Sequence, residues 1–442
     1  MALAQPLTVP DQSSNPIDFL RTLVRNGAPP YETAFGRVHF INEPEHVARV
    51  LDDDVLQRTD LVKLVLGRGL LSSDGPYWRK QRKLMQPEFA RLKNESFVRL
   101  VTESTERLLE TWRPLAKEGA TLDVAPVMTQ LTLEVIVSAL FSVELNSQGP
   151  ELGDAITVLM EGLGEYAGMT FNIPMSFSPQ GKREFSAALA EVDAFCKGII
   201  DERRAAMGSG APVPQDLLAL LMSVEGQEQL SDTDLRDEVV TMLISGHETT
   251  ALILSWSWAL LDTNPEVLGR LHEELDQVFR DRTPTLEDIP KLALTRQILM
   301  ESMRLYPPVW FIARRATRKT EIGPITVLAG ENALLCPYLV HRHPDYWESP
   351  ESFDPERFTP EAIAARPRGV YIPFGGGRHT CLGQHLAMIE GILMLATLAR
   401  EVRVTLVEPT CPEIQPAITL RQLQGVRATL HPRATIPAVP PS

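Results

Sequence analysis

Residues 374–383 read FGGGRHTCLG, and the helical pattern QHLAMIEGILMLATLAREV follows at once. The three glycines at 375–377 permit positive φ angles and close backbone approach. The chain therefore delivers Cys381 from a glycine loop to the start of a helix, where amide N–H groups and the helix dipole favour an ionised sulfur. A lone cysteine near glycines is more often buried and inert, so the interpretation depends on the rest of the chain.

Most of the chain outside this loop has helical periodicity. Apolar residues recur at i, i+3, i+4 and i+7 in five stretches, which are residues 94–112, 127–143, 185–206, 235–262 and 265–280. After Thr249 the fourth stretch is apolar on almost every side, which is typical of a helix that runs through the interior. Short segments bordered by Pro or Gly predict strands at 38–42, at 322–328 and in the last thirty residues, whereas the proline-rich stretch 343–373 predicts irregular structure. We expect a mainly α fold with small β-sheets around a long central helix.

Composition limits the class of protein. The chain has 43 basic and 57 acidic residues and a net charge of −14, which argues against a nucleic-acid partner. Four cysteines without a C-x-x-C pair fit neither a disulfide scaffold nor a multi-cysteine zinc site. The uncharged apolar stretch 249–261 is shorter than the roughly 18 residues of a membrane span, and the amino terminus lacks the pattern of a signal peptide or membrane anchor. We therefore expect a cytoplasmic protein.

Domain organisation follows from the absence of linkers. Residues 1–16 and the Pro-rich tail 437–442 have the composition of disordered ends. No Gly/Ser linker, repeat or long charge block divides the chain between them. The sequence predicts one domain over residues 17–436.

The middle of the central helix reads SGHETT, residues 245–250. Gly246 and either Thr249 or Thr250 share a face, so a missing side chain could open a groove beside a hydroxyl group. Taken alone, such a segment is more often a helix whose threonine bonds its own backbone and whose Glu248 is solvated.

Two further patterns are weak one by one. Glu301 and Arg304 are three residues apart on one helix face, as in many solvated ion pairs. Trp78 and Arg82, four residues apart, on their own indicate an ordinary amphipathic helix rather than a binding site. The order of the patterns along the chain is what makes them informative.

Together these motifs resemble the cytochrome P450 family of haem-thiolate enzymes, whose signature is F-G-x-G-x-[R/H]-x-C-x-G. The residues in register are Phe374, Gly375, Gly377, His379, Cys381 and Gly383. The resemblance implies a single-domain cytochrome P450 fold around a buried haem b. It also implies that Cys381 is the proximal thiolate ligand of the iron, a ligand that favours O–O cleavage.

The resemblance assigns roles to other residues as well. It makes Glu248 and Thr249 an acid and alcohol pair that relays protons to the reacting oxygen, with Gly246 beside the oxygen groove. Cationic and indole groups would contact the haem propionates, and the candidates are Trp78, Arg82, His379 and either Arg314 or Arg315, with Arg378 left open. Arg357 would complete a structural network with Glu301 and Arg304.

The implied reaction is monooxygenation, in which one atom of O2 enters an organic substrate and the other leaves as water. Electrons would come from NAD(P)H through a separate ferredoxin or flavodoxin with its reductase. A basic cluster could receive that partner, or it could be a solvated helix face, and its members are Arg79, Lys80, Arg82 and Lys83.

The substrate is less defined. Residues 309–312 read VWFI and favour a lipophilic small molecule, although core packing explains them equally well. Arg68 could hold a carboxylate, so fatty acid, terpene, steroid and polyketide substrates stay open. The competing functions are a peroxide-driven peroxygenase, a haem-binding sensor and a haem-free helical scaffold, and the pair Glu248 and Thr249 argues for monooxygenation.

Overall fold

The computed structural model describes residues 15–433, with gaps at 26, 146–147, 169–170, 172–177, 225, 227–228 and 280–281. The ends predicted to be disordered lie outside the described residues, apart from Asn15 and Pro16. The Asn15 side chain accepts the Ile17 amide at 2.9 Å, and Pro16 begins the first helix.

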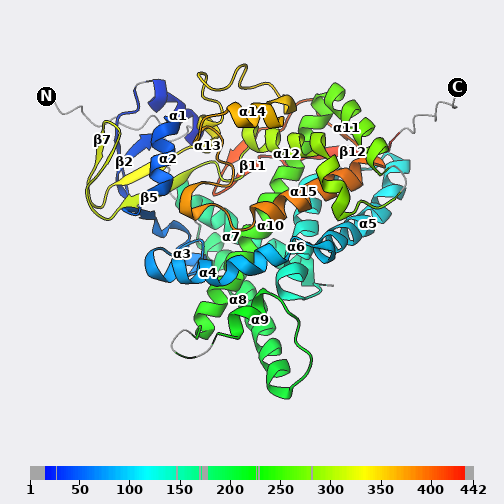
Figure 1. Ribbon diagram of the computed structural model, residues 1–442, viewed down its shortest axis with the longest axis horizontal. Helices are drawn as coiled ribbons and strands as arrows, with labels where there is room; N and C mark the ends of the chain where they lie inside the picture. The colour runs from blue at the N-terminus through cyan, green and yellow to red at the C-terminus, as the bar shows by residue number, and fades with distance from the viewer. Residues whose placement is uncertain are drawn as a thin grey trace.

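Helices make up most of the described chain (Figure 1). The α-helices are α1 (Pro16–Arg25), α2 (Pro44–Asp52), α3 (Lys63–Leu66), α4 (Gly75–Arg91), α5 (Glu95–Glu118), α6 (Val124–Phe141), α7 (Gly149–Gly168), α8 (Pro179–Ser209), α9 (Leu217–Met222), α10 (Asp232–Thr263), α11 (Pro265–Val278), α12 (Ala293–Leu305), α13 (Pro337–Val340), α14 (Pro360–Ala365) and α15 (Gln384–Ala399). Short 3-10 helices are η1 (Asp60–Val62), η5 (Leu286–Lys291), η6 (Pro355–Phe358) and η7 (Gly377–His379). The five predicted helices are confirmed, with ends that differ by a few residues. The stretch 343–373 is less irregular than predicted, because η6 and α14 form within it.

The strands form four small sheets. They are β1 (Tyr31–Thr33), β2 (Gly36–Ile41), β3 (Leu56–Arg58), β4 (Thr121–Asp123), β5 (Ile312–Ala316), β6 (Thr320–Ile322), β7 (Ile325–Val327), β8 (Asn332–Leu335), β9 (Val402–Leu406), β10 (Ile414–Pro416), β11 (Leu420–Gln422) and β12 (Arg427–Pro432). The largest sheet has the order β1-β2-β8-β5-β3, with β2 and β8 parallel and the other pairs antiparallel. The smaller sheets are β4-β12-β9, β10-β11 and β6-β7. The five-stranded sheet lies with α1 and α2 on the left of Figure 1, apart from the helical part.

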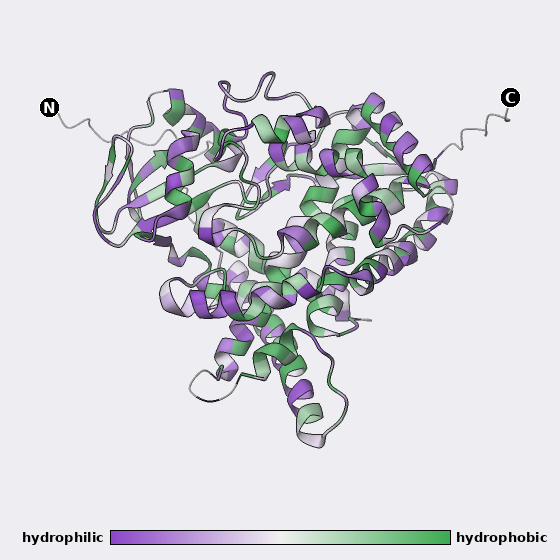
Figure 2. Ribbon diagram, in the orientation of Figure 1, coloured by the Kyte–Doolittle hydropathy of each residue, from purple (hydrophilic) through white to green (hydrophobic). Residues whose placement is uncertain are grey.

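The helix α10 is the centre of the fold. A capping box fixes its first turn, because the Ser231 hydroxyl accepts the Asp234 amide while Asp234 accepts the Ser231 amide. Asn264 and Pro265 end it, since Pro265 opens α11 at a position where a missing N–H costs nothing. Figure 2 shows mainly apolar residues in the central helices and hydrophilic ones toward the periphery.

The helix α6 packs along α10 at close range. A Cβ on Gly246 would lie 2.5 Å from Ile136 Cγ1, so glycine permits the approach of the two helices. The Thr132 hydroxyl donates to the His247 carbonyl at 2.9 Å and fixes their register. Within the described chain, α6 is the one helix long and apolar enough to cross a membrane, and 61% of it is buried inside the protein. Its apolarity is that of a core helix.

Candidate functional site

The glycine loop before α15 has a backbone that other residues could not adopt. Gly375 and Gly377 have φ angles of 68° and 61°, in the left-handed region. A Cβ on Gly377 would also lie 2.4 Å from the Leu51 carbonyl oxygen at the end of α2. The loop closes on itself because the Cys381 amide donates to the Phe374 carbonyl at 3.0 Å. Its shape therefore depends on the glycines, as the sequence predicts.

Cys381 lies between this loop and the first turn of α15. Burial among protein atoms raises the pKa of its thiol, while the amides of Gly383 and Gln384 and the charge of Arg82 lower it. Burial is the largest cause, so the net shift is upward. The side chain nevertheless has accessible surface. Cys381 is therefore surrounded by protein atoms but not sealed by them.

Four basic side chains from separate segments converge beside the loop. They are Arg58 on β3, Arg82 on α4, Arg314 on β5 and His379 on η7. Burial and, to a lesser extent, repulsion from Arg314 lower the pKa of Arg58 to about 9, although Asp74 acts in the opposite direction. Burial and the neighbouring arginines lower the pKa of His379 to about 2. The cluster therefore has more cationic groups than its surroundings neutralise.

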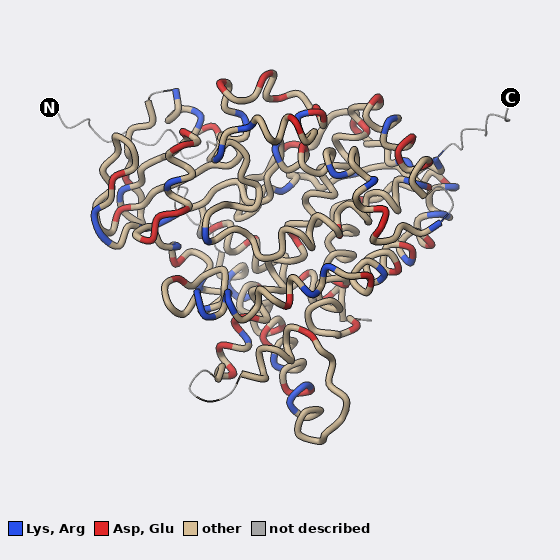
Figure 3. The backbone as a smooth tube through the Cα atoms, viewed as in Figure 1, with Lys and Arg blue, Asp and Glu red and all other residues tan. Residues whose placement is uncertain are grey.

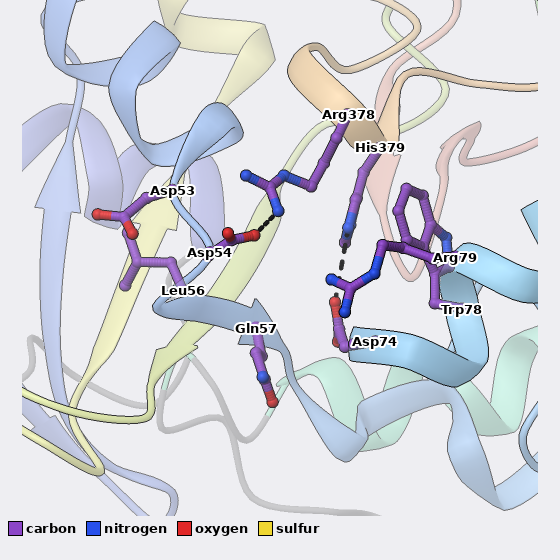
Figure 4. A pocket seen from close by; sticks show the side chains of 10 residues that line it. Asp53, Asp54, Leu56, Gln57, Asp74, Trp78, Arg79, Arg378 and His379 are labelled. Carbon is purple, nitrogen blue, oxygen red and sulfur yellow. Dashed lines mark ion pairs between the residues drawn. The ribbon is translucent and has the colours of Figure 1, made fainter.

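Asp74 supplies part of the missing negative charge. Its carboxylate accepts the Arg58 amide at 2.8 Å and lies 3.7 Å from His379 Nε2 (Figure 4). The Trp78 indole stacks near the His379 ring with centroids 4.1 Å apart, and its Nε1 is buried without an acceptor. A group with several anionic oxygens would satisfy these donors.

The structure shows which of the arginines that the sequence left as alternatives, Arg314, Arg315 and Arg378, belongs to the basic cluster. Arg315 points to the other side of β5, where it donates to Asn332 Oδ1 and to the Phe35 carbonyl. The Arg378 side chain is directed to Asp54, with which it pairs (Figure 4), although its charge still contributes to the low pKa of His379. Strand alternation puts Arg314, not Arg315, beside Arg58.

The middle of α10 presents a polar, partly exposed patch inside the fold. Between residues 237 and 261 every side chain is buried except Ser245, Gly246 and Thr249. The Thr249 hydroxyl donates to the Ser245 carbonyl at 3.0 Å, and Thr250 makes a longer bond of 3.4 Å to the Gly246 carbonyl. A side chain at position 246 would point toward α6. Glycine is therefore needed here for the packing of α10 against α6, whether or not it also opens a groove.

Glu248 is buried and paired, contrary to the interpretation of this residue as a solvated glutamate. Its Oε1 accepts from Arg421 Nε at 2.6 Å and from the Thr419 hydroxyl at 3.2 Å, while Oε2 is buried without a partner. Arg421 Nη1 also lies 3.6 Å from the exposed Glu161. Sequence reasoning missed this ion pair, because no local spacing signals a partner 173 residues away.

The pair Glu301 and Arg304 is fully buried, as a structural network requires. Arg304 donates to both oxygens of Glu301 at 2.6 and 2.7 Å and to the carbonyls of His341, Pro350 and Ser352. Arg357 Nε lies 3.5 Å from Glu301 Oε1. The prediction that these three residues support the fold is confirmed.

Two predicted pocket residues belong to the core. Trp310 and Phe311 are buried among aromatic rings, and Trp310 Nε1 donates to the Ala417 carbonyl at 2.8 Å. Arg68 is exposed and stacks over Tyr77 with its Cζ 4.3 Å from the ring centre. Core packing therefore explains Trp310 and Phe311, whereas Val309 is exposed and Ile312 is half-buried.

The sequence model of the family described as cytochrome P450 matches residues 32–425 of this chain. The chain belongs to the cytochrome P450 family. This P450 is similar to cyclooctatin synthase of Streptomyces melanosporofaciens, at 32% identity over 92% of the chain and 89% of the relative. It is 34% identical to cyclooctat-9-en-7-ol 5-monooxygenase of the same organism, over 87% and 84% of the two chains.

Solved P450 structures share the fold. The heme domain of cytochrome P450DA superposes with a TM-score of 0.83 at 25% identity and covers 95% of this chain and 93% of its own. The predicted family and the mainly helical P450 fold with small sheets are confirmed. The protein is a P450 monooxygenase, and its cofactor and cosubstrate are a thiolate-ligated haem and O2.

Arg58 is the site residue that sequence reasoning missed. It lies on a three-residue strand in LQRTD, with no motif around it. Only the pairing of β3 with β5, which sets Arg58 opposite Arg314, brings it to the cluster.

Proposed function

We propose that Cys381 holds the haem iron and that the basic cluster holds the propionates. The observation that carries this proposal is the accessible residue Cys381 beside a cluster in which Arg58, Arg82 and Arg314 outnumber the one neighbouring carboxylate, Asp74. Haem supplies the oxygen-activating chemistry when bound. Phe374, Gly375 and Gly383 then shape the loop around the ligand, and the Gly383 amide hydrogen-bonds the sulfur.

The test is the difference spectrum of the dithionite-reduced protein with and without carbon monoxide. We expect the strongly red-shifted Soret band of thiolate ligation, and its loss in Cys381→Ser. Cys411→Ser is the matched control, because this partly buried thiol lies near Thr263. A red-shifted band that persists in Cys381→Ser would contradict the ligand assignment.

We propose that Thr249 and Glu248 hold and pass the protons that O2 reduction consumes. Thr249 is partly exposed within the otherwise buried middle of α10, and Glu248 keeps one oxygen without a partner. The same pair favours monooxygenation over peroxide-driven peroxygenation and over a sensor, since neither alternative needs protons delivered to O2.

We propose that the substrate is a lipophilic small molecule with an alicyclic skeleton. This proposal rests on the relative whose name gives cyclooctat-9-en-7-ol as its substrate. Titration with alicyclic alkenols and with fatty acids of similar size, followed by the spin-state shift of the Soret band, discriminates the two classes. Tighter binding of the fatty acids would contradict the proposal.

We propose that electrons arrive from NAD(P)H through a ferredoxin or flavodoxin that docks on α4. Lys and Arg mark this helix in Figure 3, and Arg79 and Lys83 are exposed while Arg82 turns inward to donate to the Thr380 carbonyl at 2.7 Å. Charge reversal at Arg79 and Lys83 should slow reduction and weaken its salt dependence. Reversal of the distant, exposed Lys117 is the control, and equal effects would overturn this docking site.

Two further expectations remain proposals. We propose one haem domain over residues 17–436, which limited proteolysis of the holoprotein tests by the boundaries of its resistant core. We propose a cytoplasmic location, which fractionation of the producing cells tests.

A further inference from the structure

Four polar side chains form a stripe along α10. Glu238, Thr241, Ser245 and Thr249 are spaced by three, four and four residues and so lie on one helix face. At 1.5 Å per residue, successive members are about 4.5–6 Å apart along the axis, which one water molecule can bridge. The stripe therefore connects the amino-terminal part of α10 with the patch at Thr249.

The two members farthest from Thr249 carry buried atoms without partners. Glu238 is completely buried, and its Oε2 accepts the Leu70 amide at 2.9 Å while Oε1 has no hydrogen-bond partner. The Thr241 hydroxyl oxygen is likewise buried and unpartnered. Since a buried polar atom without a partner is unfavourable, ordered water between them is the simplest resolution.

A glycine-containing loop seals this end of the stripe. A Cβ on Gly69 would lie 1.9 Å from Thr241 Oγ1, so the backbone covers the hydroxyl directly. The Arg68 amide donates to Asp237 Oδ2 at 2.7 Å, one residue before Glu238. The loop amides thus bind the carboxylates of Asp237 and Glu238 but leave Oε1 of Glu238 without a partner.

The charges around Glu238 favour its protonated form. Burial, helped by the nearby carboxylates of Asp237 and Asp234, raises the pKa of Glu238 to about 8, although the hydrogen bond from the Leu70 amide acts in the opposite direction. From α4, the Tyr77 hydroxyl donates to Asp234 at 3.1 Å, close to the surface. The cations in this region, Arg68 and Arg236, lie against Tyr77 and Asp237.

We propose that Glu238 is a second internal proton donor, which passes protons through Thr241, Ser245 and intervening water to Thr249. Each turnover reduces one atom of O2 to water with two electrons and two protons. Glu238 gives up one of these protons and regains one from solvent at the Asp234 end. The proposal rests on the proposed roles of haem and Thr249.

An infrared measurement tests the donor without turnover. The spectrum of the holoprotein minus that of Glu238→Gln at neutral pH should contain a protonated carboxyl C=O band that shifts in D2O. Glu390→Gln is the matched control, because Glu390 is also buried with its pKa raised well above the ordinary value but lies on α15. If the difference instead shows only carboxylate bands, Glu238 is ionised and the proposal is overturned.

Turnover tests the pathway. Glu238→Gln and Thr241→Val should lower kcat about tenfold and raise the solvent isotope effect, with Thr241→Ser close to the wild type. Asp237→Asn weakens the same loop clamp without touching the stripe, so it should leave the isotope effect unchanged. An equal effect in Asp237→Asn, or none in Glu238→Gln, overturns the pathway. A wild type without a thiolate band or product would instead contradict the proposed function itself.

Discussion

Two buried carboxylate–arginine pairs show how the same chemistry serves different ends. In the pair Glu301 and Arg304, both carboxylate oxygens and the guanidinium have partners. In the pair Glu248 and Arg421, one carboxylate oxygen has none. A closed pair fixes backbone segments in place, whereas an open pair keeps an oxygen available to water or protons. The first pair supports the fold, and the second lies beside the candidate relay.

The largest effect is expected at the closed pair. Glu301→Ala leaves the Arg304 charge buried without its partner, which should cost about 3–5 kcal/mol in the free energy of unfolding. Urea denaturation of the holoprotein and the yield of the carbon monoxide complex measure it. Glu103→Ala is the control, because its ion pair with Arg99 is exposed, and a loss of similar size there would contradict the comparison.

A smaller loss is expected at the open pair. Arg421→Met removes the cation that holds Glu248 but leaves the Thr419 hydroxyl, so we expect about 1–3 kcal/mol in unfolding and an altered coupling of NAD(P)H oxidation to product. Glu161→Gln should change stability by less than about 1 kcal/mol, because Glu161 is exposed and only 3.6 Å from Arg421. If Arg421→Met destabilises as much as Glu301→Ala, the two pairs do not differ in kind.

Thr249→Ala should act on function with little effect on stability. Its hydroxyl bonds only the Ser245 carbonyl, but loss of proton delivery should divert electrons into peroxide or water. Product formed per NAD(P)H consumed should fall severalfold. Thr250→Ala, one residue away on a buried face, should retain coupling, and equal losses in both variants would remove the special role of Thr249.

The last effect concerns pH and the surroundings of the closed pair. Burial, with repulsion from Arg304 and Arg342, lowers the pKa of His341 to about 3. The unfolded chain, with a pKa near 6.5, binds the proton that the folded protein excludes. This contribution to stability is therefore complete above about pH 6.5 and is lost as the pH falls toward 3, by about 1 kcal/mol per pH unit.

Unfolding at several pH values checks the prediction. His341→Gln should flatten the acid limb of the stability curve, whereas His431→Gln, at an exposed position, should not. An unchanged slope in His341→Gln would show that other groups govern the acid limb.

The sequence by itself determined the features that are local in the chain. The glycine loop with Cys381, the i, i+3 pair Glu301 and Arg304, and the helical periods of α5, α6 and α10 follow from spacing, since backbone geometry brings those residues together without other segments. The resemblance to the family added the expectation that motifs far apart in the sequence belong to one site.

Only the tertiary structure decided the rest. The choice of Arg314 over Arg315, the addition of Arg58, and the partner of Glu248 each depend on strand pairing or on contacts between segments far apart in sequence. The placement of Trp310 and Phe311 in the core is another example, because an apolar run in the sequence does not indicate whether its side chains contact a substrate or the core. Long-range packing decides these features. The physical reason is that the burial of a side chain and the neutralisation of its charge depend on the residues that surround it in the folded protein, and those residues come from distant segments.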